Sequence, residues 1–244
     1  MTEELAKTCP PEGESPSGES PGPRRVPLTM VQKTAAKRMV LSAREIPQFS
    51  ISRELDADQL TARRARINAA LSEEDGRVSV TALLIWLTAR ALLEHPRMNS
   101  QFDEDAAIQH EQVNMAVAMD APYGLVAPVI HGAETLSVTE TAAALKDLGA
   151  RAMEKRLSMN DFADATFTTS NLGMLGVSSF IPMVNPPQGA IMGVSAPRTG
   201  VKVDDEGQLV PSRAIELTVT ADHRILDGAE VARFLQTLAE SVAE

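Results

Sequence analysis

Two kinds of apolar spacing alternate along the chain from residue 28 onward, and this alternation restricts the fold more than any other feature. Helical spacing and helix-forming composition predict helices over residues 31–42, 56–71, 81–94, 136–155 and 228–243. Period-two alternation or short apolar runs predict strands over 48–52, 112–119, 124–130, 165–170, 189–194 and 214–221. Because both kinds interleave while strands dominate the last third, we predict an α/β (α+β) fold of two layers, a mixed β-sheet packed with helices.

The start of the chain has a different composition. Six of the 15 prolines fall within residues 1–27, among Glu, Ser and Gly. Such a segment buries too little apolar surface to offset the entropy lost on ordering. We therefore predict a disordered Pro/Glu/Ser-rich tail or linker over 1–24. No linker-like stretch interrupts 25–244, so these residues are predicted to form one domain.

Composition, charge and motif content exclude several kinds of binding partner. The chain has 33 acidic and 23 basic residues, and its net charge of −10 would repel a polyanion, so we expect no nucleic-acid partner. Cys9 is the single cysteine, and neither a zinc-type Cys/His spacing nor a phosphate-binding glycine loop occurs, so no metal is expected. Apolar runs end well before 18 residues and no signal-peptide pattern is present, so we expect a cytoplasmic protein with no membrane partner.

Two polar clusters contain residues suited to catalysis. His223 and Asp227 lie in a short turn, TADHRILDG, between a predicted strand and a predicted helix. A loop of this kind presents an imidazole, although a turn with solvated side chains has the same pattern. The second cluster, TFTTSNLG, runs from a hydroxyl-rich strand into a glycine turn at residues 166–173. A half-exposed strand enriched in Thr for its β preference is the alternative interpretation there.

These motifs resemble a known family. DHRILDG (222–228), TFTTSNLGMLG (166–176), VNPPQGAIMGV (184–194), GLVAPVI (124–130) and LTMVQKTAAKRM (28–39) are similar, in this order, to motifs of the catalytic domain of dihydrolipoamide acyltransferases. These are the acyltransferase components of 2-oxo acid dehydrogenase complexes. A more distant resemblance is to chloramphenicol acetyltransferase, which has a similar HxxxDG site.

The resemblance implies a chloramphenicol acetyltransferase-like, trimer-forming fold whose site lies between subunits. It also implies exchange of an acyl group between a dihydrolipoyl thiol and coenzyme A. His223 would be the general base and Ser170 the oxyanion donor, while Asp227 would order the loop. Supporting and binding roles would fall to Thr168, Thr169 and Asn171 at the oxyanion and to Arg64 at a coenzyme A phosphate.

The chain also departs from that family. No lipoyl domain precedes residue 25, so the lipoyl group is expected from another chain, with a lipoyl-bearing protein and dehydrogenase components as possible partners. Trp86 and His131 stand where relatives commonly have Lys and Arg, which would weaken phosphate binding. The polar end of the chain, residues 239–244, predicts a discrete homotrimer. Two alternatives remain: a coenzyme A-dependent O- or N-acyltransferase of a small molecule, and a non-catalytic trimeric scaffold subunit.

Overall fold

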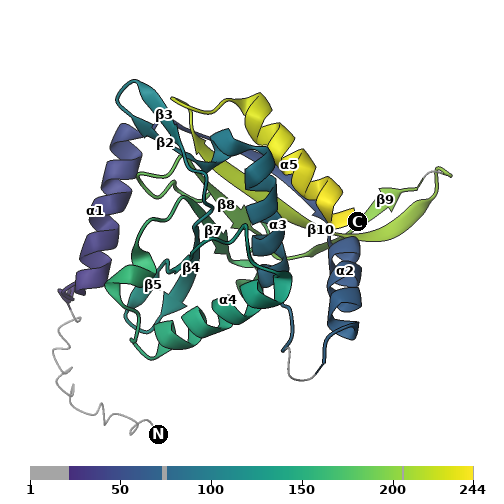
Figure 1. The fold of residues 1–244 in the computed structure, drawn as a ribbon, viewed down its shortest axis with the longest axis horizontal. Helices are drawn as coiled ribbons and strands as arrows, with labels where there is room; N and C mark the ends of the chain where they lie inside the picture. Colours follow the sequence, from purple (N-terminus) through teal and green to yellow (C-terminus); the bar gives the residue numbers. More distant parts are fainter. Residues whose placement is uncertain (1–21, 73–75, 205, 244) are drawn as a thin grey trace, which may run out of the picture.

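The computed structural model describes residues 22–72, 76–204 and 206–243. The predicted tail over 1–24 therefore lies outside the described residues, apart from its last three. The described part contains five α-helices and ten β-strands, interspersed along the chain; Figure 1 shows their arrangement. None of these helices combines the length and the apolar character that crossing a membrane requires.

The five helices lie close to their predicted positions. They are α1 (Met30–Glu45), α2 (Ala57–Ala69), α3 (Val80–Glu94), α4 (Val138–Met153) and α5 (Gly228–Ala243). Side-chain caps explain several starts: the hydroxyls of Thr29 and Ser137 accept backbone N–H groups of the first turns of α1 and α4, and Asp56 does so for α2. Short 3₁₀ turns at Pro96–Asn99, Met159–Phe162 and Gly173–Leu175 complete the helical segments.

Eight strands form one mixed sheet. Its main path is β1 (Gln48–Asp56), β10 (Leu209–Asp222), β8 (Ala190–Val194), β7 (Phe167–Asn171), β4 (Met115–Ala121) and β5 (Gly124–Val126). Two short strands lie off this path, β6 (Val129–Ile130) beside β4 and β9 (Arg198–Val203) beside β10. β7 runs parallel to both β4 and β8, whereas the other pairs are antiparallel. The predicted mixed sheet is therefore confirmed.

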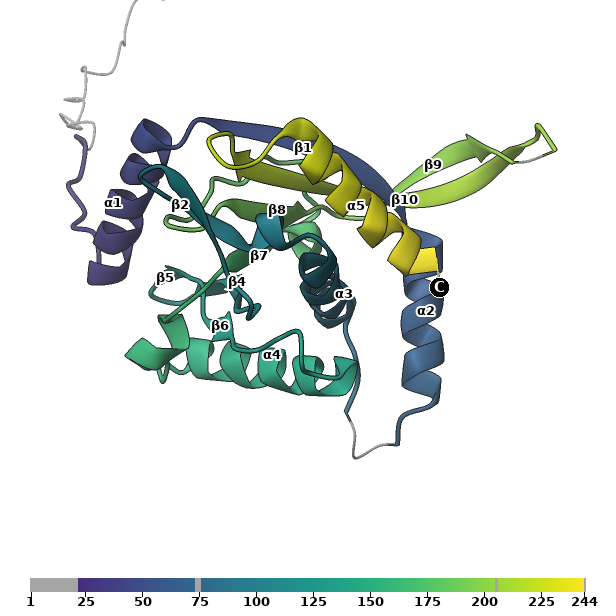
Figure 2. The ribbon, with the colours of Figure 1, turned by 45° about the horizontal axis from the view of Figure 1, so that its top comes forward.

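The helices α3, α4 and α5 cover one face of the sheet (Figures 1 and 2). The core lies between these two layers, where Phe167 of β7 packs against the fully buried Phe234 of α5. α1 stands apart, beside β5, and its one buried residue is Ser42, whose hydroxyl donates to the Val184 carbonyl. We call the sheet face opposite α3, α4 and α5 the open face.

Three features of the sheet differ from the predictions. β2 (Ser100–Asp103) and β3 (Ala106–Gln109) form a separate two-stranded ribbon, and β9 pairs with an extended β10 in an arm that projects from the body (Figure 2). All residues of β3 and β9 are exposed, so no alternation of buried and exposed positions marks them. The predicted strand 124–130 is divided between β5 and β6 around Pro128, a residue without a backbone N–H donor.

Candidate active site

The loop that carries His223 begins at the C-terminal end of β10, an inner strand of the sheet. The backbone N–H of Asp222 donates to the Gly189 carbonyl (2.8 Å), and that of His223 donates to the Pro47 carbonyl (2.9 Å). These two bonds tie the loop to the residue that precedes β8 and to the connection before β1. The His223 side chain is exposed, and its ring lies against Phe49 with centroids 4.4 Å apart. A fixed backbone thus presents an imidazole to solvent.

An ion pair flanks His223 on both sides in the sequence. The Asp222 side chain is 2% exposed, and its carboxylate accepts hydrogen bonds from the backbone N–H and the guanidinium of Arg224 at 2.7–3.1 Å. The same guanidinium lies over the Phe102 ring, 3.8 Å from its centroid. Neither Asp222 nor Arg224 was predicted from the sequence to have a functional role. The only sequence feature that could have indicated this ion pair is that an acidic and a basic residue flank the histidine.

Asp227 ends the loop and begins α5. Its carboxylate accepts the Glu230 backbone N–H (2.9 Å), while the Glu230 carboxylate accepts the Asp227 N–H (3.0 Å), a reciprocal capping arrangement. The backbone hydrogen bond from Glu230, and more weakly the positive charges of Arg233 and Arg97, lower the pKa of Asp227. An ionised carboxylate therefore fixes the end of the histidine loop.

Ser170 lies on the open face. Along β7, Phe167 points into the core, so Ser170, an odd number of positions away, faces the other side of the sheet. Its register partners are Ala118 on β4 and Gly193 on β8. Phe180 covers Gly193, where an added Cβ would lie 2.8 Å from the ring. Within the described residues the Ser170 hydroxyl makes no hydrogen bond, so its proton is available.

The neighbours of Ser170 on β7 have other surroundings. Thr168 shares its face, but the Thr168 hydroxyl donates to the side-chain carbonyl of Gln188. The Thr169 hydroxyl is buried on the helix side and has no hydrogen-bond partner among the described residues. Asn171 also points to the helix side, where its amide donates to the Thr81 hydroxyl (2.9 Å). The structure therefore does not bring these three groups together with the Ser170 hydroxyl.

Within one chain, His223 and Ser170 are far apart. Ser170 is in register with Gly193, and Gly193 is in register with Thr218 on β10. His223 follows Thr218 by five positions, so its Cα lies roughly 16 Å along the strand and 10 Å across it from the Cα of Ser170, or roughly 19 Å in all. Two side chains do not span this distance.

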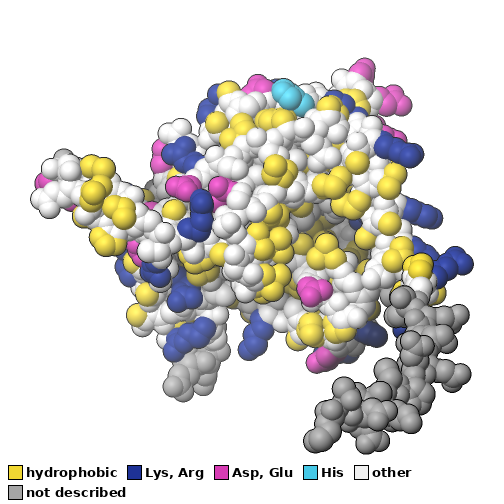
Figure 3. Space-filling view, turned by 180° about the vertical axis from the view of Figure 1, so that it is seen from behind, with side chains coloured by type: hydrophobic (Ala, Val, Ile, Leu, Met, Phe, Trp, Pro, Cys, Tyr) yellow, Lys and Arg dark blue, Asp and Glu magenta, His cyan; other side chains and the backbone are white. Residues whose placement is uncertain are grey.

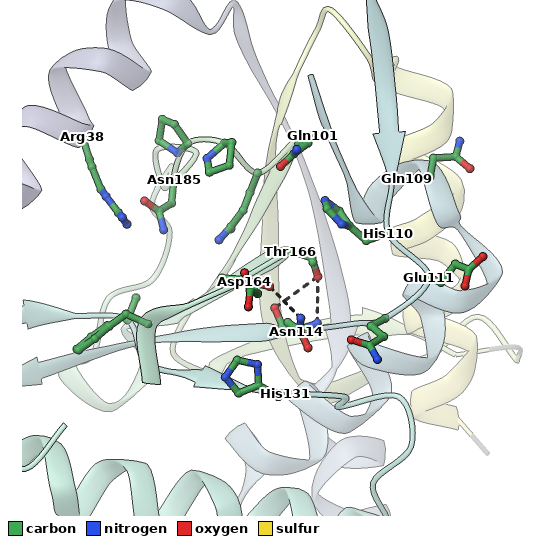
Figure 4. A pocket seen from close by; sticks show the side chains of 17 residues that line it. Arg38, Gln101, Gln109, His110, Glu111, Asn114, His131, Asp164, Thr166 and Asn185 are labelled. Atoms are coloured by element: carbon green, nitrogen blue, oxygen red, sulfur yellow. Dashed lines mark hydrogen bonds between the residues drawn. The ribbon is translucent and has the colours of Figure 1, made fainter. Parts of the chain in front are cut away.

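A polar hollow of about 880 Å³ opens at the same sheet edge as the histidine loop. In the view of Figure 4, Arg38 and Asn185 line one side of it, and Gln109, His110 and Glu111 line the other. Asn185 belongs to the Asn-Pro-Pro segment of the VNPPQGAIMGV motif. His131 also lines the hollow, so one of the departures from the family motifs lies at this site.

Arg64 lies on α2, which leaves the sheet at the end opposite His223. β1 ends at Asp56 beside Ala214, and α2 follows directly. The guanidinium Nε of Arg64 is buried without a hydrogen-bond partner among the described residues. On α3, the Arg90 guanidinium lies 3.9 Å from the centroid of the Trp86 ring, and the guanidinium of Arg63 on α2 lies 5.9 Å from it. Trp86 therefore has positive charges beside it.

The sequence and the fold are similar to those of known proteins. The 2-oxoacid dehydrogenases acyltransferase (catalytic domain) family matches residues 20–244. The chain belongs to this family. The dihydrolipoyllysine-residue acetyltransferase component of the pyruvate dehydrogenase complex of Rickettsia felis is 38% identical over 215 residues, which are 87% of this chain and 52% of that protein. The chain thus spans about half the length of the curated relatives it matches.

Solved structures of family members have the same fold. A structure of the dihydrolipoamide acetyltransferase of Azotobacter vinelandii superimposes with a TM-score of 0.87 at 30% identity, covering 97% of this chain and 98% of that one. That work concerns the role of a serine, a histidine and an asparagine in the catalytic mechanism of that enzyme. Chloramphenicol acetyltransferase superimposes with a TM-score of 0.54 at 15% identity over 84% of this chain. The predicted fold class is therefore confirmed.

Proposed function

We propose that this family member exchanges an acyl group between coenzyme A and a dihydrolipoyl thiol carried by another polypeptide, as the core component of a 2-oxo acid dehydrogenase-type complex. The observation that carries the proposal is the pair of presented groups: an exposed imidazole on an anchored loop, and a serine hydroxyl with an uncommitted proton. In the Azotobacter protein the catalytic histidine follows the serine by 52 positions, and the asparagine follows the histidine by four. Here His223 follows Ser170 by 53 positions, and Asp227 follows His223 by four.

The proposed chemistry uses these residues as follows. A thiol with a pKa of about 8.5 is mostly protonated at neutral pH, so it needs a base. The His223 imidazole accepts its proton as the sulfur attacks the thioester carbonyl carbon. The carbonyl oxygen becomes an oxyanion, which accepts a hydrogen bond from the Ser170 hydroxyl. The tetrahedral intermediate then expels the second sulfur, which takes the proton back from the imidazolium.

A single protomer does not bring the base and the donor together, and this supports a site formed between protomers of a homotrimer. The open face offers a surface for such contacts, because apolar side chains gather on it (Figure 3). The connection from β7 to β8 crosses this face, and its Met174, Leu175 and Ile181 side chains are exposed. We propose that a neighbouring protomer covers these side chains and supplies its own His223 to the site of Ser170.

Mixing of two inactive variants tests the proposal. His223→Ala removes the base and Ser170→Ala removes the donor, so each homotrimer is expected to lose most activity with acetyl-coenzyme A and free dihydrolipoamide. If each site takes its histidine and serine from different protomers, random mixed trimers regain about a quarter of wild-type activity, because every mixed trimer has one intact site.

The control mixes His223→Ala with a chain that carries both substitutions, a pair that forms no intact site in any arrangement. The proposed shared site is wrong if the two single variants, shown by mass spectrometry to have formed mixed particles, stay as inactive as this control. Full activity of His223→Ala alone would remove the catalytic assignment itself.

Coenzyme A binding has a separate test. The unpartnered buried Nε of Arg64 fits an anionic ligand such as a phosphate group. Arg64→Gln is expected to raise KM for coenzyme A while KM for dihydrolipoamide stays within about twofold of wild type, because dihydrolipoamide carries no phosphate. An equal rise in both KM values would contradict the assignment.

A further inference from the structure

We propose that Arg224 is a positioning residue for the reaction: with Asp222 it clamps the turn on both sides of His223 and so sets where the imidazole is held. This inference rests on the proposed function, since it concerns the base of that reaction. Neither residue has a part in the acyl transfer described above. The proposal is carried by the hydrogen bonds, the burial and the stacking around these two side chains.

The ion pair closes across the histidine. The Arg224 backbone N–H and Nε both donate to Asp222 Oδ1 at 3.0 Å, and Arg224 Nη2 donates to Oδ2 at 2.7 Å. A guanidinium that engages both carboxylate oxygens fixes direction as well as distance. The residue between the two partners is thereby held with its backbone in one conformation.

The buried end of the pair is anchored to the sheet. Asp222 is the last residue of β10, in register with Gln48 of β1, and its backbone N–H bonds to Gly189. Its carbonyl accepts the N–H groups of Ile225 and Leu226, which closes the turn. Because the carboxylate is almost completely buried, removing its cationic partner would leave a charge without compensation. The clamp therefore starts from a fixed point.

The outer end of the pair is also held. The Arg224 guanidinium stacks on Phe102 of the β2–β3 ribbon, so it is gripped by a carboxylate at its edge and by an aromatic ring at its face. The hydrogen bond to Asp222 raises the pKa of Arg224, and the nearby Glu45 carboxylate adds to this effect. Further along the turn, Arg97 donates to the Ile225 carbonyl and pairs with Glu230.

Lysine at position 224 would keep the charge but lose this geometry. An ammonium group has no plane to stack on Phe102 and no fork to match two carboxylate oxygens. The turn would then be free to shift by a fraction of an ångström while the fold persists. A misplacement of about 1 Å at a catalytic group can cost about a hundredfold in rate.

The central test is the kinetics of Arg224→Lys. We expect kcat to fall about ten- to a hundredfold while KM for coenzyme A and for dihydrolipoamide stays within about twofold. The matched control is Arg151→Lys, because Arg151 also grips both oxygens of an aspartate, Asp161, at 2.8 Å. Arg151 is on α4, away from the histidine loop, so its variant is expected to lose thermal stability with kcat unchanged.

Phe102→Leu serves as a second variant in case Arg224→Lys does not fold. It leaves the ion pair intact but removes the aromatic face, and we expect kcat to fall about two- to tenfold with the same unchanged KM values. A further readout is the NMR signal of the His223 ring, identified by its loss in His223→Ala. We expect it to move in Arg224→Lys and to stay in place in Arg151→Lys.

Three results would overturn the inference. One is wild-type kcat in folded Arg224→Lys, and another is wild-type kcat in Phe102→Leu where the lysine variant does not fold. The third is a selective rise in KM for coenzyme A with unchanged kcat, which would make Arg224 a substrate contact. These failures are distinguishable from failure of the proposed function, because that would appear as full activity of His223→Ala.

Discussion

Gly189 offers a quantitative test of how tightly the histidine loop is packed. This glycine precedes β8, is buried, donates its N–H to the Ser100 carbonyl (2.7 Å) and accepts the Asp222 N–H (2.8 Å). A Cβ added there would lie 2.6 Å from the Ser100 carbonyl oxygen and 2.9 Å from Ile225 Cδ1. The Ile225 atom is the end of a side chain, whereas the Ser100 oxygen belongs to the backbone and cannot move without it.

The size of the expected effect follows from that contact. Ordinary contact begins at 3.4 Å, so the Ser100 backbone and β8 must separate by about 0.8 Å to accept alanine. Overpacking of this kind costs about 1–3 kcal/mol of unfolding free energy. For a domain of this size, that corresponds to a melting temperature lower by roughly 2–12 °C. Because the moved strand also holds Asp222, acyl transfer by the folded variant is expected to fall.

Gly149→Ala is the matched control. Gly149 lies inside α4, and nothing is within 4 Å of the position of an added Cβ. Alanine there is expected to stabilise the protein by roughly 0.5–1 kcal/mol, because glycine loses more backbone entropy in a helix. Differential scanning fluorimetry and urea unfolding measure both variants. If Gly189→Ala melts at or above the wild-type temperature, the close packing inferred here is refuted.

Three further predictions concern stability. Phe234→Ala removes a fully buried ring from the core and is expected to cost about 3–5 kcal/mol in urea unfolding; a loss under about 1 kcal/mol would contradict the packing. Ser137→Ala removes the cap of α4 and is expected to cost about 1 kcal/mol, which Ser137→Asp should largely restore. Burial has the largest single effect on Asp161 and raises its pKa, but the hydrogen bonds from Ser158 and Arg151 outweigh it and lower the pKa. The stabilisation from Asp161 is therefore present above about pH 4 and lost below it, so the difference in unfolding free energy between wild type and Asp161→Asn should shrink between pH 6 and pH 3; a constant difference would disprove this.

The helices could be predicted because their signals are local. α5 occupies the predicted residues 228–243, and its buried Val231, Phe234 and Leu238 recur at helical spacing. The strands that could not be predicted lack any local signal of burial. Every residue of β9 is exposed, and β9 pairs with the outer half of β10 as an antiparallel hairpin, so backbone pairing and not side-chain burial defines this strand. The alternation of apolar and polar residues that marks a strand cannot arise where neither face of the strand is buried.

Some residues of the candidate site could also be predicted from the sequence, and others could not. The histidine between a strand and a helix and the serine at the end of a threonine-rich strand are visible as polar clusters, but their roles were predicted only from the resemblance of the surrounding motifs to a known family. The function of Arg224 is not visible, since a charged pair two positions apart looks like any solvated turn until burial of Asp222 and the face of Phe102 are known.

The largest gap between sequence and site is the distance from His223 to Ser170. The register of the sheet holds the two residues apart within one chain. Ser170 is level with Thr218, whereas β10 continues four residues beyond Thr218, to Asp222, before His223 follows. No loop rearrangement closes this separation without breaking the ladder between β8 and β10. In the proposed mechanism each protomer would therefore contribute two half-sites, and a chemistry that needs both would depend on how copies of the chain pack. This is why mixed trimers, rather than any single substitution, give the decisive experiment.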